Sequence, residues 1–383
     1  MSARTDLLVV GAGAVGATAA LALRRLGYTV QVLDAGAPVH APEYSTVDAR
    51  VFALSPASIT WLQTLGLWPE VAARAQDYGG MRVWDAVSGS DIAFDAASLG
   101  LPRLGAIVEN QAIVAAAQAG LDDVRYETRL AGLEEQDAGV RVQCEDGAVF
   151  EARYALLADG AGSPGRSALG IRTTGRDYGG RAVVCHVQAE YGHDQTAWQR
   201  FLPNGPVALL PLFDGRVSVV WSTTTAEATS LLQLDDSAFA AALTEATAGR
   251  LGACTQPTAR LAFALRRQTA DRFTTARCVL LGDAAHVVHP LAGQGVNLGF
   301  DDARALVKVM GDKEAGLKPV ARRRYERQRR AEIARMSLGI DALDRLFSTS
   351  NPALAALRGA GLHAVDVLEP VKRQFAEAAL GAG

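Results

Sequence analysis

The fold of this chain is decided near its N-terminus by the stretch Leu7-Leu8-Val9-Val10-Gly11-Ala12-Gly13-Ala14-Val15-Gly16. An apolar run typical of a buried strand leads directly into a Gly-x-Gly-x-x-Gly turn, and the alanine- and leucine-rich segment 17–26 predicts a packed helix. Residues 28–33 predict a second strand, which ends at Asp34. A strand, a glycine turn, a helix and a strand ending in an acid together indicate a dinucleotide-binding site.

Such a site gives each part of this unit a physical task. The glycines let the backbone approach a pyrophosphate at the N-terminus of the helix, where peptide N–H groups point outward. The carboxylate of Asp34 would bind the ribose hydroxyls of the adenosine and repel a 2′-phosphate, which favours FAD or NAD over NADP. A strand–helix–strand unit without a ligand is the alternative. The predicted cofactor-binding residues here are Gly11, Gly13, Ala14, Val15, Gly16 and Asp34.

A second informative stretch, far along the chain, is Gly282-Asp283-Ala284-Ala285-His286-Val287-Val288-His289-Pro290-Leu291-Ala292-Gly293-Gln294-Gly295-Val296-Asn297. It joins a strand-like run to a helix-like segment, so Asp283 is expected at the carboxyl edge of a sheet, where it can accept hydrogen bonds from ligand hydroxyls. Gly293 and Gly295 would leave the N–H groups at the helix start unobstructed, which suits an electron-rich ring or an anion. A glycine-rich turn with no ligand is the alternative.

Three further positions can contribute to the same ligand. Asp159-Gly160 follows an apolar strand and again places an acid at a sheet edge, with a plain Asp-Gly turn as the alternative. Arg50, in the run Asp48-x-Arg50, would lie near the pyrophosphate or would be a surface charge. Gln111 lies at the start of an alanine-rich helix.

Strand-end sites so far apart in the sequence can serve one ligand only if that ligand is extended. NAD would be satisfied mainly by the N-terminal unit, whereas FAD also carries a ribityl chain and an isoalloxazine ring. Asp283 would bind the ribityl hydroxyls, and the helix start at 293–297 would stabilise negative charge on the reduced flavin. The far site therefore favours FAD. Its predicted residues are Gly282, Asp283, Pro290, Gly293, Gly295, Val296 and Asn297, together with Arg50, Gln111, Asp159 and Gly160.

Composition supports a compact protein and excludes several function classes. The chain has 383 residues and is 49% hydrophobic, which is enough for two domains with substantial cores. A net charge of -3 and a pI of about 6.1 give no general attraction to nucleic acid. The cysteines form no CxxC pair, and no apolar run approaches the ~20 residues of a membrane span, so we expect a cytoplasmic protein without a leader sequence.

The character of the sequence changes in its middle third, where longer alternating strands predict an antiparallel sheet. Strands are expected at 182–190, 207–212 and 216–222, with a hairpin turn at Asp214-Gly215.

We therefore predict an α/β fold in which a Rossmann-like FAD-binding domain contains an inserted antiparallel-sheet substrate domain. The FAD-binding domain would comprise residues 1–171 and 264–383, with C-terminal helices in 317–380, and the inserted domain residues 172–263. Part of 78–103 is expected to join the inserted sheet.

The chain resembles the class A flavoprotein aromatic hydroxylases, and among them the ubiquinone-biosynthesis hydroxylases. The resemblance rests on the glycine unit with Asp34, on Asp48-x-Arg50-x-x-Ala53-Leu54-Ser55, on Asp159-Gly160 and on His289-Pro290-Leu291-Ala292-Gly293-Gln294-Gly295-Val296-Asn297. It extends to the runs 200–212 and 370–381 and so covers nearly the whole chain. Gln111 departs from the pattern, because many relatives have arginine there.

This resemblance implies an activity. FAD would be reduced by NAD(P)H, react with O2 to give a C4a-hydroperoxide, and deliver one oxygen atom to the ring of a polyprenylated phenol or quinol intermediate of ubiquinone biosynthesis. The protein would orient the ring and exclude water, with the inserted sheet covering the substrate. His289 would assist deprotonation of a phenol, or would be a loop histidine bonded to backbone. The residues expected at the reactive face are His289, Pro290, Leu291, Gly293 and Gln294.

Other interpretations of the same residues remain open. A flavoenzyme of this fold could instead reduce prenyl double bonds or halogenate its substrate, and a non-catalytic scaffold could organise other ubiquinone-biosynthesis proteins. His286 and His289 have no third ligand nearby in the sequence, so no metal is expected. The basic run 322–335 would be a solvated helix face, or would attract an acidic partner or the anionic inner face of a membrane.

Overall fold

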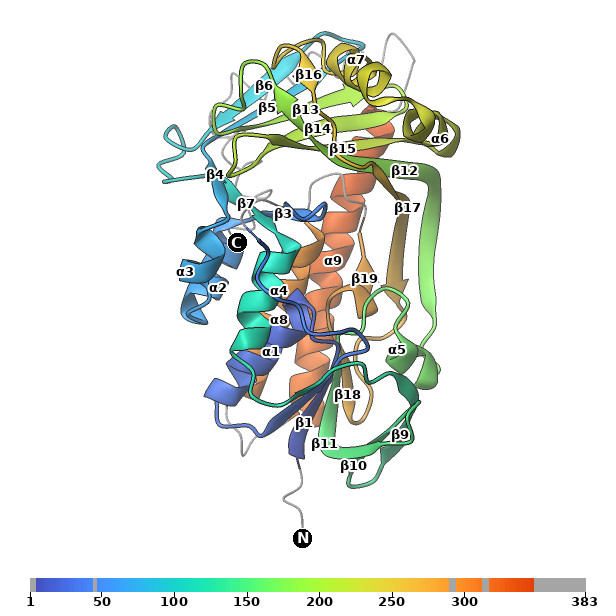
Figure 1. Cartoon of the computed structure of the whole chain (residues 1–383). Helices are drawn as coiled ribbons and strands as arrows, with labels where there is room; N and C mark the ends of the chain where they lie inside the picture. The colour runs from blue at the N-terminus through green and yellow to red at the C-terminus, as the bar shows by residue number, and fades with distance from the viewer. Residues whose placement is uncertain (1–4, 44–46, 289–293, 312–316, 348–383) are drawn as a thin grey trace.

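The computed structural model describes residues 5–43, 47–288, 294–311 and 317–347. Figure 1 shows two bodies: a lower one, in which helices α1, α4 and α8 pack on a largely parallel sheet, and an upper one, in which α6 and α7 cover a large sheet. Two long strands, β12 (Thr173–Ala189) and β17 (Leu261–Ala270), run from the lower body into the upper sheet. Residues distant in sequence therefore meet at the junction of the two bodies.

The centre of the lower sheet is β1 (Thr5–Val10), which pairs in parallel with β2 (Val30–Leu33) and β11 (Val149–Leu157). Leu7, Leu8 and Val9 have no exposed surface, as expected for a strand covered on both faces. The sheet is completed by β8 (Val124–Arg125) beside β2, by β18 (Cys278–Leu280) beside β11, and by antiparallel β9 (Leu130–Gln136) and β10 (Gly139–Cys144).

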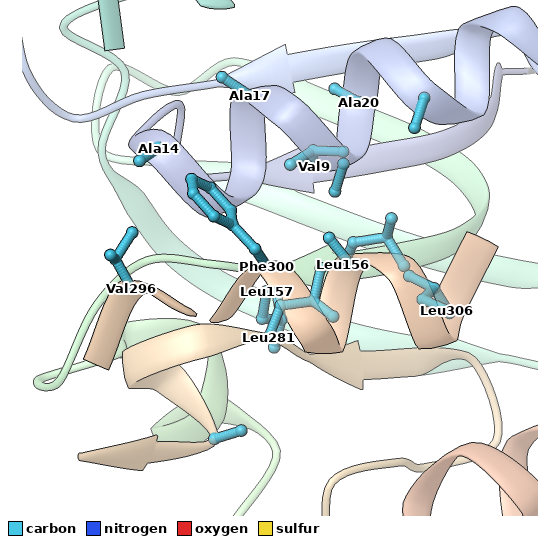
Figure 2. Close-up of a cluster of buried hydrophobic side chains, with 14 of the residues drawn as sticks. Val9, Ala14, Ala17, Ala20, Leu156, Leu157, Leu281, Val296, Phe300 and Leu306 are labelled. Carbon is cyan, nitrogen blue, oxygen red and sulfur yellow. The ribbon is translucent and has the colours of Figure 1, made fainter. Parts of the chain in front are cut away.

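Helices α1 and α8 of the lower body pack against each other, with small residues at their contact. Figure 2 shows the side chain of Phe300 reaching from α8 (Gly295–Met310) toward α1 (Ala14–Arg25), which presents alanines such as Ala14 and Ala17. A Cβ atom at Gly299 would lie only 2.4 Å from Cγ2 of Val15, so only glycine fits there. The N-terminal parts of α1 and α8 are thereby held against each other.

The upper sheet has the strand order β19-β17-β12-β15-β14-β13-β5-β6. On one face, Val183, Cys185 and Val187 of β12 form a core with α6 (Thr225–Gln233) and α7 (Asp236–Ala246). The alternate residues of β12 therefore face the lower body. The other strands are β5 (Gly80–Asp85), β6 (Asp91–Asp95), β13 (Thr196–Leu202), β14 (Gly205–Pro211), β15 (Val217–Thr224) and β19 (His286–Val287), and β16 (Cys254–Thr255) pairs with β12.

Two further features connect the bodies. A small sheet is formed by β3 (Val51–Leu54), β7 (Gly105–Glu109) and β4 (Gln76–Tyr78). Helix α9 (Pro319–Phe347) begins on the lower body, where the hydroxyl of Tyr325 donates to the carbonyl of Leu280 at 3.0 Å, and ends with Phe347 stacked on Phe201 of the upper sheet. The remaining helices are α2 (Pro56–Thr64), α3 (Trp68–Ala72), α4 (Asn110–Ala119) and α5 (Pro164–Ala168).

The α/β fold and the individual strands expected from the sequence are confirmed, with shifted ends. The first helix begins at Ala14 rather than at 17, because the last part of the glycine turn is already helical. After Asp159-Gly160 the chain enters α5 and not a hairpin. Strands from 78–103 lie in the upper sheet, while the domain boundaries stay a prediction and residues 348–380 lie outside the described residues. Among the described helices, none combines the length and apolarity needed to cross a membrane.

Candidate functional site

The start of α1 is built to receive an anion. Gly13 precedes the helix in an extended conformation, and no side chain of the described chain caps it, so the N–H groups of the first turn are open. Gly11 has φ +102°, and a Cβ there would lie 2.3 Å from the carbonyl oxygen of Ala158. A Cβ at Gly13, by contrast, would meet no atom within 4 Å. The turn thus packs tightly against Ala158 at Gly11 and is open at Gly13. A pyrophosphate would fit in the open space beside Gly13.

Asp34 lies beside this turn at the end of β2. Its Oδ2 accepts from the N–H of Ala12 at 2.5 Å and its Oδ1 from the N–H of Gly36 at 2.7 Å. These two bonds fix the carboxylate next to the glycine turn. Each carboxylate oxygen can accept a second hydrogen bond, so Asp34 remains able to bind ribose hydroxyls.

Asp283 lies in the short helix η1 (Gly282–Ala284) that follows β18, at the carboxyl edge of the lower sheet. Its side chain is open to solvent, and no hydrogen bond reaches its carboxylate from the described residues. Although Asp283 has exposed surface, the protein packed around its carboxyl group partly removes it from water and raises its pKa; the charges of His286 and Arg50 oppose this effect, and that of Asp302 adds to it. With no hydrogen bond to another described residue, the carboxylate is available to a ligand.

The two ends of the predicted ligand site are adjacent. Gly282 has φ +57°, and a Cβ there would lie 3.3 Å from the side chain of Val15, which also contacts Gly299. The starts of α1 and α8 and the strand end at Asp283 therefore surround one region, which is what a single extended dinucleotide requires.

The side chain of Asn297 bonds within the protein, while its assignment as a cofactor-binding residue stays a prediction. Its Oδ1 accepts from the N–H of Ser55 at 3.0 Å and from the hydroxyl of Ser58 at 2.7 Å. Its Nδ2 donates to the carbonyl of Ala53 at 2.9 Å and to Oε1 of Gln294 at 3.2 Å. With both donors and both lone pairs used, the side chain fastens α8 to β3 and α2. Only its backbone N–H is left for a ligand.

The remaining residues of the α8 start fall into two groups. Val296 is buried, and Gln294 and Gly295 are half-buried at a helix start that no described side chain caps. His289, Pro290, Leu291 and Gly293 lie outside the described residues. Their assignment to the flavin and to the reactive face stays a prediction.

Asp159 is used mainly by the protein itself. Its Oδ1 accepts from the hydroxyl of Ser163 at 2.5 Å and its Oδ2 from the N–H of Gly165 at 2.9 Å, so the carboxylate holds the first turn of α5. Burial raises its pKa, against the opposing effects of these hydrogen bonds and of Arg166. Gly160 adjoins this turn at φ +84°. A direct contact of either residue with a cofactor stays a prediction.

The loop that carries Arg50 is fixed by a buried ion pair. The N–H of Asp48 donates to Oε1 of Glu109 at 2.6 Å, and Nε of Arg74 donates to Oε2 of Glu109 at 2.5 Å. The carboxylate of Asp48 accepts from the N–H groups of Arg50 and Gln111, each at 3.0 Å. Gln111 thus lies beside the Arg50 loop, with its side chain donating to the carbonyl of His40 at 3.2 Å.

A buried polar cluster behind Asp283 was not predicted from the sequence. Asp302 accepts from the N–H of Gly282 at 2.8 Å, from Nε2 of His286 at 2.6 Å and from Nε of Arg329 at 2.6 Å. Burial alone would raise the pKa of Asp302, but His286 and Arg329 more than offset it and hold the pKa below its usual range. Arg329 also donates to the carbonyl of Leu298 at 3.1 Å. The cluster joins the strand end, α8 and α9.

The basic run 322–335 is therefore not uniformly a solvated face. Arg329 is 1% exposed, whereas Arg323, Arg324, Arg327 and Arg335 are exposed. The signal that could have identified it is helical phase, because Tyr325, Arg329 and Ile333 recur at four-residue spacing on the buried side.

Two other observations bear on ligands. In the described parts of the chain, no group of three or more His, Cys, Asp or Glu side chains is arranged to hold a metal, and Nε2 of His286 is already bonded to Asp302. A surface hollow of about 860 Å³, lined by α7 and residues 253–257, lies on the far face of the upper sheet. This hollow is therefore separate from the strand ends, at which FAD is predicted to bind.

Comparison with known proteins agrees with this geometry. Residues 4–337 match the model of a family described as an FAD binding domain. The chain is 35% identical to the Escherichia coli 3-demethoxyubiquinol 3-hydroxylase, with 98% of both chains covered. It is 33% identical to the mitochondrial ubiquinone biosynthesis monooxygenase COQ6 of Homo sapiens, over 97% of this chain and 91% of that protein.

Solved structures are similar in fold. The p-nitrophenol 4-monooxygenase of Pseudomonas putida matches with a TM-score of 0.82 at 20% identity, covering 99% of both chains. Klebsiella pneumoniae HpxO, solved with FAD and uric acid, matches with a TM-score of 0.77 at 21% identity, over 98% of this chain and 97% of that one.

Proposed function

Because the chain belongs to the FAD-binding-domain family that includes the ubiquinone-biosynthesis hydroxylases, we propose that it hydroxylates the ring of a polyprenylated phenol or quinol intermediate of ubiquinone. It is an FAD-dependent monooxygenase, with NAD(P)H as the reductant and O2 as the source of the oxygen atom. The observation that carries the substrate class is the identity of 33% or more, over nearly the whole chain, to relatives named for ubiquinone hydroxylation.

The protein's own contribution is to bind, orient and shield. When bound, FAD supplies the redox chemistry and the activation of oxygen. The open N–H groups at the start of α1 would hold the diphosphate, and Asp34 the adenosine ribose. Asp283 would accept hydrogen bonds from the ribityl hydroxyls, since its carboxylate makes no hydrogen bond to another described residue. The start of α8 would place N–H groups at the ring, where negative charge develops.

The substrate would lie between the flavin and the lower face of the upper sheet. The alternate residues of β12 face this side, because Val183, Cys185 and Val187 belong to the core on the other face. We include His289, Pro290, Leu291, Gly293 and Gln294 in the proposal as the residues at the reactive face. Of these, Gln294 is tied to Asn297 of the same helix.

A peripheral contact with an anionic membrane surface is part of the proposal, because a polyprenylated substrate resides in lipid. Exposed arginines of α9 support it, as do Val320 and Leu338, which are 70% and 68% exposed on the same helix. The alternative is that α9 contacts other ubiquinone-biosynthesis proteins and not the membrane surface. Flotation of the purified protein with vesicles containing anionic lipid, against neutral vesicles as control, distinguishes the two.

The deciding experiment supplies the purified FAD-loaded protein with NADPH or NADH, a demethoxyubiquinol-type substrate and isotopically labelled O2. One labelled oxygen atom in the ring of the product is expected. A saturated prenyl chain or a halogenated ring without label would assign a different flavoenzyme of this fold. A protein that binds no reducible FAD would leave only a scaffold role.

A further inference from the structure

His186 connects the upper sheet to the loop that carries Arg50. It lies on β12 between Cys185 and Val187, which belong to the core under α6 and α7, so its side chain leaves the sheet on the opposite face. There Nε2 lies 3.0 Å from the backbone carbonyl oxygen of Asp48. The side chain is 2% exposed, so this contact is buried at the junction of the two bodies.

The partner atom fixes the form of the imidazole. A carbonyl oxygen can only accept, so Nε2 carries the hydrogen. Nδ1 is buried and has no hydrogen-bond partner among the described residues, which fits a neutral ring with an unprotonated Nδ1. Burial and the charge of Arg216 lower the pKa of His186, against the opposing effects of the Asp48 carbonyl, Asp214 and Glu109. The histidine is therefore a neutral donor at neutral pH.

Asp48 connects His186 to Arg50, which is a predicted FAD-binding residue. Its carboxylate accepts from the N–H of Arg50 at 3.0 Å, two residues along the chain. Its own N–H is held at 2.6 Å by Glu109, which is paired with Arg74. The loop is thus held by the lower body through Glu109 and by the upper sheet through His186. Arg50 directly precedes β3, and the carbonyl of Ala53 in that strand accepts from Nδ2 of Asn297 at the start of α8, at 2.9 Å.

We propose that His186 is a positioning residue: from the upper sheet it holds the backbone of Asp48, and through that loop it fixes the position of Arg50, a predicted FAD-binding residue. The histidine itself does not touch the cofactor. This inference deepens the proposed function because it concerns the same FAD site, but it is independent of which substrate is hydroxylated. Its consequence is that a residue of the sheet contributes to FAD affinity through Arg50.

The test uses two substitutions that separate the ring nitrogens. In His186→Gln the side-chain amide can reach the position of Nε2 and still donate to Asp48. In His186→Asn the shorter amide reaches only the position of Nδ1. FAD affinity is measured by flavin fluorescence during titration of the apoprotein with FAD, so no substrate or turnover is needed. We expect affinity within ~2-fold of wild type for His186→Gln and a loss of ~5-fold for His186→Asn, the size expected for one buried hydrogen bond.

The dependence on Arg50 is tested by repeating both measurements in an Arg50→Ala background. If His186 acts through this loop, His186→Asn should change FAD affinity by less than ~2-fold once Arg50 is absent, because the effects of coupled residues do not add. An equal loss in both backgrounds would overturn the proposal. So would unchanged affinity of the His186→Asn protein with Arg50 in place.

His193 offers a matched control. Its Nε2 lies 3.1 Å from the carbonyl oxygen of Leu212, in the loop between β14 and β15. His193 therefore makes the same type of contact, but within the upper body and not to the loop that carries Arg50. His193→Asn should leave FAD affinity unchanged in either background. If His186→Asn does not fold, His186→Met, which fills similar space but has no donor, replaces it: a loss of FAD affinity that disappears without Arg50 supports the proposal, and unchanged affinity or a loss that persists without Arg50 refutes it. Loss of ubiquinol hydroxylation with FAD affinity intact would count against the proposed function only.

Discussion

Asp302 accepts a hydrogen bond from Nε of Arg329 at 2.6 Å, and the two residues are only 0% and 1% exposed. The same carboxylate accepts from the N–H of Gly282 and from His286, which places three charged or polar partners around one buried group. Because Gly282 directly precedes Asp283, the Asp302–Arg329 ion pair also fixes the backbone next to Asp283, the proposed ribityl-binding residue. Helix α9 is thus linked through Asp302 to the segment that carries Asp283.

The first prediction concerns Arg329. Arg329→Met should lower the free energy of unfolding by ~3–5 kcal/mol, because it leaves Asp302 as a buried charge without its cation. The expected measurement is urea denaturation of the apoprotein. Arg327→Met, an exposed position two residues away on the same helix, is the matched control and should change the free energy by less than ~0.5 kcal/mol. Equal effects at the two positions would mean that the buried pair contributes nothing specific.

The second prediction distinguishes Asp159 from Asp283, two acids that both follow an apolar strand in the sequence. Asp283→Ala should weaken FAD binding and remove the yellow absorbance of the purified protein, with little change in far-UV circular dichroism. Asp159→Ala should mainly lower the free energy of unfolding, by ~1–3 kcal/mol, because Ser163 and Gly165 lose their acceptor. The assignment fails if Asp283→Ala destabilises the apoprotein as much as Asp159→Ala does.

The third prediction is a dependence on pH. The pKa of Asp302 lies below its usual range, so the folded value is lower than the unfolded value of about 3.9. The ionised carboxylate therefore stabilises the fold above that value, and this contribution is lost as the pH falls through the folded pKa. The difference in unfolding free energy between wild type and Asp302→Asn should be largest near neutral pH and shrink below about pH 4. A difference independent of pH would show that the carboxylate is not ionised in the fold.

The fourth prediction concerns Asn297. Asn297→Ala should cost ~2–4 kcal/mol of stability, because it leaves the N–H of Ser55 and the carbonyl of Ala53 without their buried partner. Asn204→Ala is the control, since Asn204 makes an exposed contact with Glu227 and should cost less than ~0.5 kcal/mol. If FAD affinity falls while the stability of the apoprotein is unchanged, Asn297 binds the cofactor directly and the clamp interpretation is wrong.

The local structure around Gly11 and Asp34 could be predicted from the sequence more completely than that around Asn297 and Asp283. The glycine turn and Asp34 lie within one strand–helix–strand unit, so their spacing alone fixes their geometry, and the bonds from Asp34 to Ala12 and Gly36 follow from it. The role of Asn297 depends on Ser55, which is 242 positions away, and no local pattern specifies that meeting. The exposed position of Asp283 and its lack of a partner among the described residues likewise emerge only when the strands are assembled.

The arginines of α9 show a second limit. Arg327 and Arg329 belong to the same basic run and cannot be distinguished by composition. One is exposed and the other is buried against Asp302, because helical geometry rotates them to different faces. Helical phase could have separated them, but naming the partner requires knowing that α8 lies alongside.

The contact between Val15 and Gly299 has a consequence for how such chains can diverge. The separation of the two helix starts is set by the absence of a side chain at position 299, where a single added carbon would come within 2.4 Å of Val15. A relative with alanine at the position of Gly299 would need a smaller residue at the position of Val15 to keep both helix ends on one cofactor. We therefore expect these two positions to vary as a pair across homologues.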